Sequence, residues 1–166
     1  TAFSAQAQRA ADKVIETRRE FEVTAAFGVR THAEMVLRNL ISNAVKFSEP
    51  EKEIVIRSSL QDGRVLVSVL DDGIGLSGAT ESSADGVSYL TSRRGTAGEK
   101  GTGLGLTLCF DLCRGDGQGI SLTDNPGGGA VASFTLDVWH PGESHSAPAR
   151  EEVSPTAPIN LVRRAG

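Results

Sequence analysis

Two glycine-rich stretches of this 166-residue chain have the residue types of a phosphate-binding and base-binding site. They are Asp71-Asp72-Gly73-Ile74-Gly75-Leu76 and Gly101-Thr102-Gly103-Leu104-Gly105-Leu106. In the second stretch the glycines lead into a predicted helix, so backbone N–H groups and the positive end of the helix dipole can face a phosphate chain. The dipole contributes only about 0.3 to 1 kcal/mol per charge at an exposed site. A divalent cation must therefore share the binding of a triphosphate.

A helical stretch ahead of both glycine runs carries groups that can hold such a cation. At about 100° per residue, Asn39, Ser42, Asn43 and Lys46 fall on one narrow stripe. Mg²⁺ takes oxygen ligands, usually one or two from protein, and the side-chain carbonyl of Asn43 would supply one. Asn39 and Lys46 lie one turn before and after it, beneath the phosphates. A solvated polar face is the alternative, but two Asn residues are poor helix formers with no cap to serve, which favours function.

Asp71 follows an apolar strand, where its carboxylate can accept the exocyclic amine hydrogen of adenine. Gly73 and Gly75 would let the base lie against the backbone. Guanine has a carbonyl at that position, so the contact favours adenine, whereas Asp72 is predicted to be a turn residue facing water. The spacing Gly73-x-Gly75-x-x-Gly78 also matches the dinucleotide fingerprint. That motif should open an apolar helix, which residues 77–83 cannot form, so we reject it.

The elements that must position these residues follow from hydrophobic spacing and turn residues. An amphipathic helix is predicted from the first residues to about Arg18-Arg19, then a short strand through Phe21 and Val23. Thr31-His32-Ala33-Glu34 has the form of a capping box, and the helix that it opens is expected to end at Glu49-Pro50.

The rest of the chain is predicted to form two hairpins and a further helix. Residues 54–56 and 65–70 flank Asp62-Gly63, a hairpin signal, and residues 120–122 and 131–138 flank a second turn at 125–129. The helix after the second glycine run should stop at Gly115. This order predicts an α/β fold, a two-layer sandwich with a mixed, mainly antiparallel sheet covered on one face by helices.

Two segments have the composition of irregular structure. Residues 77–100 are rich in Gly, Ser and Thr and are too long for an ordinary connection, so we expect a mobile lid over the site. Residues 140–166 have no period and are predicted to be a largely disordered tail, with the apolar patch 159–162 as a solvated end rather than a docking peptide. Residues 1–139 would then form one domain.

Composition excludes several classes of protein. A formal net charge of -4 argues against a broad nucleic-acid surface. No stretch reaches the roughly 18 to 20 apolar residues of a membrane span, and no signal-peptide pattern opens the sequence, so we expect a cytoplasmic domain without membrane contact, whose parent protein can still be anchored. Cys109 and Cys113 have no flanking His cluster, which favours reduced core thiols over a disulfide or zinc.

Three motifs together resemble the ATP-binding catalytic domain of sensor histidine kinases, in the superfamily that also holds gyrase, the heat-shock chaperone ATPase and mismatch-repair ATPases. The stretch Asn39 to Phe47 resembles the N box, Asp71 to Leu76 the first glycine box, and Gly101 to Leu106 the second. The resemblance covers about residues 31–136. It implies the Bergerat-type sandwich, with ATP and Mg²⁺ bound under a flexible lid.

The resemblance also implies a role for individual residues. Asn43 would ligate Mg²⁺, Lys46 would contact phosphate and Asp71 would bind adenine, with Asn43 and Lys46 as the catalytic candidates. Ser133 or Thr135 would support the base through water, and the residues leave that choice open. The complete set of candidate site residues is Asn39, Asn43, Lys46, Asp71, Gly73, Gly75, Gly101, Thr102, Gly103, Leu104, Gly105 and Leu106.

The chain departs from the family pattern in two places. The lid offers only Tyr89-Leu90 as an aromatic F box, and none of His32, His140 and His145 has the context of a phosphoacceptor. The resemblance therefore implies a catalytic half of a histidine kinase, acting on a His of a separate dimerisation domain, with a response regulator downstream. Two alternatives are an anti-sigma-type Ser kinase that switches partners, and a degenerate kinase domain that binds partners without ATP.

Overall fold

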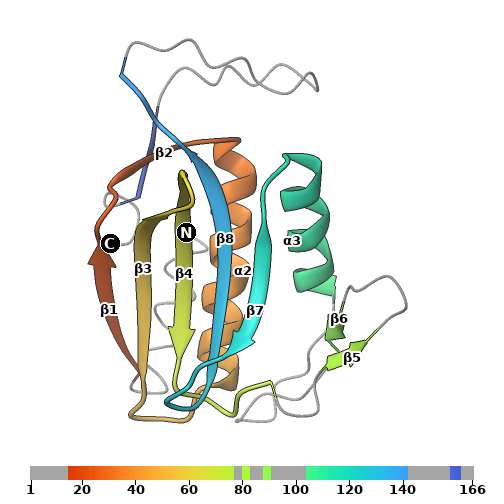
Figure 1. Cartoon of the computed structure of the whole chain (residues 1–166). Helices are drawn as coiled ribbons and strands as arrows, with labels where there is room; N and C mark the ends of the chain where they lie inside the picture. The colour runs from red at the N-terminus through yellow and green to blue at the C-terminus, as the bar shows by residue number, and fades with distance from the viewer. Residues whose placement is uncertain (1–14, 77–79, 83–87, 91–103, 142–157, 162–166) are drawn as a thin grey trace.

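A computed structural model describes residues 15–76, 80–82, 88–90, 104–141 and 158–161 of the chain. In this part of the chain a seven-stranded sheet carries two helices on one face, and a two-stranded pair lies apart from it (Figure 1). The helices are α2 (Arg30–Phe47) and α3 (Leu104–Gly115). The predicted two-layer α/β sandwich is confirmed.

The sheet is mixed and mainly antiparallel, as predicted. Its strand order is β1-β3-β4-β8-β2-β9, and β8 also pairs with β7. Only β1 and β3 run parallel among the described strands; the other pairings in the sheet are antiparallel. The strands are β1 (Glu16–Phe21), β2 (Ala25–Phe27), β3 (Glu53–Gln61), β4 (Arg64–Asp71), β7 (Ile120–Asp124), β8 (Ala130–Val138) and β9 (Ile159–Asn160).

The hydrophobic core lies between the helices and the sheet. From α2 it takes a stripe that includes Val36 and Leu40, and from the sheet it takes alternate residues such as Val67 and Phe134. The buried residues of α3 are Cys109 and Cys113, both free thiols as predicted. Burial raises the pKa of Cys109 to about 12 and that of Cys113 to about 11. Raised pKa values of this size favour the protonated thiol, which is a weaker nucleophile than the thiolate.

Both predicted hairpins are present. Asp62 and Gly63 have φ angles of 50° and 74°, the left-handed pair that a two-residue turn between twisted strands requires. The β7–β8 turn closes through Gly128 and Gly129, with φ angles of 105° and 85°. The end of α3 at Gly115 is also confirmed.

The helix predicted to reach Arg18-Arg19 is wrong at that end. Residues 16–21 form β1, which runs parallel to β3 with Glu16 opposite Glu53. The Arg18 guanidinium lies 3.4 Å from the Glu53 carboxylate of the neighbouring strand. Pairing with a strand far along the sequence therefore overrides the local helical spacing. The remainder of that predicted helix, residues 1–14, lies outside the described residues.

The predicted capping box is also wrong. The helix α2 begins at Arg30, and its N-cap residue is Val29, which makes no side-chain capping hydrogen bond. The Ala33 amide donates to the Val29 carbonyl at 3.0 Å, so Thr31 already lies inside the first turn. The short connection from β2 sets where the helix starts.

The tail predicted over residues 140–166 contains a strand. Residues Ile159–Asn160 form β9 and pair with β2, and Ile159 and Leu161 are buried in the core cluster. The prediction of a structureless, solvated end is therefore wrong for residues 159–161. Residues 142–157 and 162–166 lie outside the described residues.

The predicted lid is described only in part. Within residues 77–100 the structure gives two short paired strands, β5 (Thr80–Ser82) and β6 (Ser88–Leu90). The other lid residues, and Gly101, Thr102 and Gly103 of the second glycine run, lie outside the described residues. The mobile lid remains a prediction.

No helix of the described chain combines the length and apolarity of a membrane span.

Candidate ATP site

Asp71 is the last residue of β4, and only 7% of its surface is exposed. It lies opposite Ile54 and shares the core-facing side of β4 with Val67 and Val69, so its side chain points toward the helix layer. Its Oδ1 atom accepts hydrogen bonds from the amides of Gly73 at 2.9 Å and Ala130 at 3.2 Å.

Two opposing effects act on the charge of Asp71. Burial raises the pKa of the carboxyl above its ordinary value, whereas the hydrogen bonds from Gly73 and Ala130 stabilise the carboxylate and oppose that shift. Both bonds go to Oδ1, so the carboxyl group is held in one orientation and Oδ2 takes neither of them. This arrangement presents a fixed acceptor at the edge of the sheet.

Glycines around Asp71 allow backbone segments to approach one another closely. A Cβ added at Gly73 would overlap the carbonyl oxygen of Phe47, and one at Gly129 would overlap the carbonyl oxygen of Asp71. A Cβ at Gly75 would lie 3.0 Å from Oδ1 of Asp124. We expected Gly73 and Gly75 to leave room for a base. In the structure the absence of a side chain at these positions also allows close contact with Phe47 and Asp124.

The loop after Asp71 is attached to two other elements. The Ile74 amide donates to the Phe47 carbonyl at the end of α2, at 3.2 Å. The Leu76 amide donates to Oδ1 of Asp124 at the end of β7, at 2.7 Å. Asp124 was not predicted as a site residue, because it lies between the predicted strand 120–122 and the predicted turn 125–129 and belongs to no motif. The loop is consequently fixed to both the helix layer and the sheet.

The C-terminal end of α2 lies at the same edge of the sheet as Asp71, the lower edge in Figure 1. Asn43 and Lys46 lie in the last turns of this helix and are half-buried. The Lys46 ammonium nitrogen is 4.8 Å from the centre of the Phe47 ring. The structure thus brings the candidate metal ligand and the candidate phosphate contact to the edge that carries the adenine candidate.

Asn39 contacts α3. A Cβ added at Gly105 would lie 2.6 Å from Oδ1 of Asn39, so the Asn39 side chain rests against the first turn of that helix. Its Nδ2 donates to the Met35 carbonyl at 3.4 Å. A hydrogen bond between Asn39 and the Cys109 thiol partly opposes the effect of burial on the pKa of Cys109. The N-box helix and the helix after the second glycine run therefore meet at Asn39, which already contacts protein groups.

The predicted water-mediated support of the base by Ser133 or Thr135 is wrong. Both residues lie on the side of β8 opposite Phe134, away from the helices. The Ser133 hydroxyl is 2.8 Å from that of Ser68, and the Thr135 hydroxyl accepts from the Gly119 amide at 2.7 Å. Successive side chains of a strand point to opposite faces. If Phe134 and Leu136 face the core, Ser133 and Thr135 must therefore face away from it.

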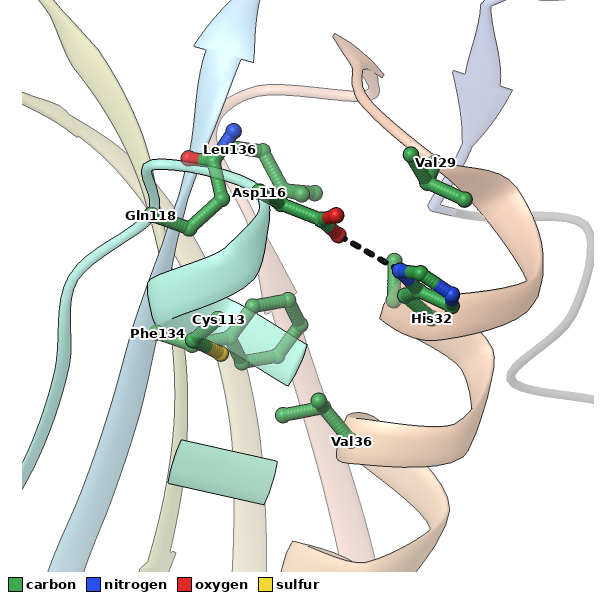
Figure 2. Close-up of a pocket in the computed structure, with 9 residues that line it drawn as sticks. Val29, His32, Val36, Cys113, Asp116, Gln118, Phe134 and Leu136 are labelled. Atoms are coloured by element: carbon green, nitrogen blue, oxygen red, sulfur yellow. Dashed lines mark hydrogen bonds and ion pairs between the residues drawn. The ribbon is translucent and has the colours of Figure 1, made fainter. Parts of the chain in front are cut away.

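The opposite end of the helix pair carries a small pocket, and two of the residues that line it, His32 and Asp116, are in hydrogen-bond contact (Figure 2). His32 Nδ1, from the first turn of α2, lies 2.8 Å from Asp116 Oδ2, just after α3. His32 therefore serves to join the two helices, far from Asp71. Among the described residues, no group of three or more His, Cys, Asp or Glu side chains is arranged to hold a metal ion.

Residues 28–140 match the family of histidine kinase-, DNA gyrase B- and HSP90-like ATPases, and the chain belongs to this family. The resemblance that the three motifs indicate is confirmed. Within the family, the similar proteins described next include a histidine kinase and the catalytic domain of another. The chain accordingly has an ATPase domain of the family that includes histidine kinases, DNA gyrase B and HSP90.

Two relatives illustrate how much of a larger protein the chain represents. It is 31% identical over 112 residues to the cell-division control histidine kinase PdhS of Brucella ovis, which covers 62% of this chain and 11% of PdhS. It is 31% identical over 111 residues to the non-motile and phage-resistance protein of Caulobacter vibrioides, covering 64% of this chain and 13% of that protein. The chain therefore spans only a small part of these relatives.

Solved structures share the fold. The catalytic domain of the histidine kinase ThkA superposes with a TM-score of 0.64 at 24% identity, covering 82% of this chain and 87% of that one. Full-length ShkA in complex with AMPPNP gives a TM-score of 0.62 at 26% identity, covering 81% of this chain and 28% of ShkA. The first likeness shows the fold alone. The second likeness is to a structure solved in complex with an ATP analogue.

Proposed function

We propose that this chain binds Mg-ATP and positions the γ-phosphoryl group for transfer to a histidine on a separate dimerisation domain. The observation that carries the proposal is the buried Asp71 carboxyl, oriented by the amides of Gly73 and Ala130. An oriented carboxylate oxygen accepts the exocyclic amine of adenine and repels the carbonyl of guanine. Asp71 is thus the specificity residue for the base.

The phosphate end of the nucleotide is assigned to α2 and the start of α3. Lys46 supplies positive charge, and Asn43 supplies one oxygen ligand to Mg²⁺, with phosphate and water completing its coordination. The support for this assignment is that Asn43 and Lys46 are half-buried in the last turns of α2, at the edge of the sheet that carries Asp71. Residues 101–106 lead into the N-terminus of α3, whose amides and dipole favour phosphate.

In the proposed reaction, the bond between the γ-phosphorus and the bridging oxygen breaks, ADP leaves, and a phosphorus–nitrogen bond forms with the acceptor imidazole. The chain contributes positioning and charge neutralisation, the main protein contributions to phosphoryl transfer. His32 is committed to Asp116, so we assign the acceptor to the dimerisation domain of the same kinase. A response regulator downstream and a cytoplasmic location complete the proposal.

Calorimetric titration of the chain tests the nucleotide assignment. A non-hydrolysable ATP analogue and its GTP equivalent are each added with and without Mg²⁺. Saturable binding that requires adenine and is tightened by Mg²⁺ supports the proposal. Asn43→Ala should abolish the Mg²⁺ effect, whereas Gln61→Ala, which removes an amide from the exposed β3–β4 turn, should not. Equal affinity for the two nucleotides, or no binding, would overturn the assignment.

Radiolabelled ATP tests the assignment of the acceptor. The chain alone should acquire little acid-labile label, and label should appear on the dimerisation domain of the parent kinase once that domain is added. Efficient labelling of the isolated chain at histidine would contradict the proposal.

A further inference from the structure

The strand β9 lies beyond residue 140, where the family match ends, yet it forms part of the sheet. It pairs antiparallel with β2, with Ala25 opposite Asn160 and Ala26 opposite Ile159. The Leu161 amide donates to the Thr24 carbonyl at 2.9 Å, which extends the pairing past the strand. Both β9 and its partner β2 lie outside the matched residues 28–140, and β9 covers the edge of the sheet that β2 would otherwise form (Figure 1).

Side chains as well as backbone hold this segment. Ile159 and Leu161 are 6% and 9% exposed, whereas Asn160 between them is exposed. A Cβ added at Gly28 would lie 3.0 Å from Leu136 and 3.8 Å from the Ile159 side chain, so the missing side chain of Gly28 leaves room there. The segment inserts alternate apolar residues into the core and presents the residue between them to solvent.

A charged side chain marks the N-terminal end of the segment. Nη2 of Arg30, the first residue of α2, donates to the Pro158 carbonyl at 3.0 Å. Proline has no amide hydrogen to donate to a sheet, so it suits the position at which the pairing begins. Recognition thus combines a main-chain ladder, two buried apolar side chains and one cationic donor.

The edge that β9 covers belongs to a weakly anchored strand. β2 has three residues, and its pairing with β8 joins Ala26 to Val138 and Phe27 to Asp137. An uncovered edge of this kind presents unpaired N–H and C=O groups. β9 satisfies such groups and turns β2 into an internal strand.

We propose that this edge, from Thr24 to Arg30, is a binding site for an extended peptide with apolar residues at alternate positions, and that residues 158–161 of the same chain are its resident ligand. Strand addition of this kind takes affinity from main-chain hydrogen bonds and specificity from pockets for alternate side chains. The inference does not rest on the proposed phosphotransfer function. It assigns the C-terminal segment a role as a bound peptide.

The test uses the full chain with a protease site inserted within residues 142–157, cut after folding. The C-terminal fragment should stay with the domain in size-exclusion chromatography and native mass spectrometry. An excess of a synthetic peptide of residues 156–163 should displace it. Ile159→Asp should weaken retention about 30-fold or more, since it replaces a buried aliphatic side chain with a charge. Leu60→Asp, on the exposed end of β3, should leave retention unchanged.

Several outcomes would overturn the proposal. One is complete separation of the unmodified fragment at micromolar concentration, and another is equal retention of the Ile159→Asp fragment. Retention in dimeric species alone would mean that a second copy supplies the strand. If the Ile159→Asp chain fails to fold, two other measurements test the proposal. Full retention of a Leu161→Ala fragment would contradict it, and so would failure of the peptide to displace the unmodified fragment.

Discussion

Alanine substitutions in the turn Gly127-Gly128-Gly129 can separate two reasons for glycine beside the candidate site. One is a left-handed φ angle, and the other is close contact with neighbouring backbone. Gly129 has a φ of 85°, and an added Cβ would overlap the Asp71 carbonyl oxygen and lie 2.6 Å from the Gly73 nitrogen. Gly128 has a φ of 105° but open space around it. Gly127 has open space and no left-handed φ. The three positions thus form a graded series within one turn.

The expected losses of unfolding free energy follow from this geometry. Gly127→Ala should change stability by less than about 1 kcal/mol, because alanine fits there. Gly128→Ala should cost about 1 to 2 kcal/mol, the penalty for a left-handed alanine. Gly129→Ala adds about 1 to 3 kcal/mol for forced backbone movement, giving a total loss of about 2 to 5 kcal/mol.

Urea unfolding, with the slope compared among the variants, measures these losses. Titration with the ATP analogue on each folded variant measures the second effect, since Gly129→Ala must displace Asp71 and lower nucleotide affinity. Equal stability of the Gly129→Ala and Gly127→Ala variants would refute the steric argument. Full nucleotide affinity in a destabilised Gly129→Ala variant would refute the link between the turn and the base site.

Further predictions concern the site and the thiols. Asp71→Asn should weaken binding of the ATP analogue about 10- to 100-fold in calorimetry, because an amide donor then faces the adenine amine. Burial raises the pKa of Asp71, so its contribution to stability is complete below the ordinary value of 3.8 and is lost as pH rises through the raised pKa. Asp71→Asn should therefore be at least as stable as the unmodified chain to urea at pH 7, with the difference shrinking toward pH 3.8. Cys109 and Cys113, with pKa values of about 12 and 11, should resist iodoacetamide at pH 8 in the folded chain and react in urea, as read by mass spectrometry. Gly105→Ala should displace the Asn39 amide and weaken ATP-analogue binding in calorimetry, with a loss of unfolding free energy below about 1 kcal/mol, since the Asn39 side chain can move.

Each of these predictions has a matched control. Asp72→Asn removes an exposed carboxylate beside Asp71 and should leave adenine selectivity intact. Gly115→Ala adds a methyl group at the end of α3, where nothing lies within 4 Å, and should leave nucleotide affinity unchanged. Rapid alkylation of the native chain would contradict the burial of the thiols. Greater stability of the unmodified chain than of Asp71→Asn at pH 7 would contradict the desolvation of the carboxyl.

The sequence predicted the elements that local chemistry determines. Asp62-Gly63 requires left-handed conformations that few other residue pairs adopt, and Gly115 ends an apolar helical period, so both boundaries were predictable. Arg18 and Ile159 could not be assigned in this way. Each lies in a strand because of a partner far along the chain. Arg18 contacts Glu53 of the neighbouring strand, and Ile159 pairs directly with Ala26.

The same distinction holds for the candidate site. Asp71 and Asn43 could be named as candidates because each stands in a short motif, and the structure places both at one edge of the sheet. Gly129 and Asp124 were not, because their role depends on the β7–β8 turn folding back onto the loop after Asp71. The predicted role of Ser133 and Thr135 was wrong because both alternate along β8 with the core residues Phe134 and Leu136 and so lie on the other face of the sheet.

The attachments at the two ends of α2 have a consequence for communication across the domain. Arg30, the first residue of α2, donates to the Pro158 carbonyl, and Phe47, the last residue, accepts from the amide of Ile74 in the loop after Asp71. An 18-residue helix is about 27 Å long, so α2 connects two attachments that lie far apart in the domain. If filling the β2 edge changes nucleotide affinity by some factor, nucleotide must change the affinity for the C-terminal strand by the same factor. α2 would then couple the binding of a peptide at its N-terminal end to the binding of the base at its C-terminal end.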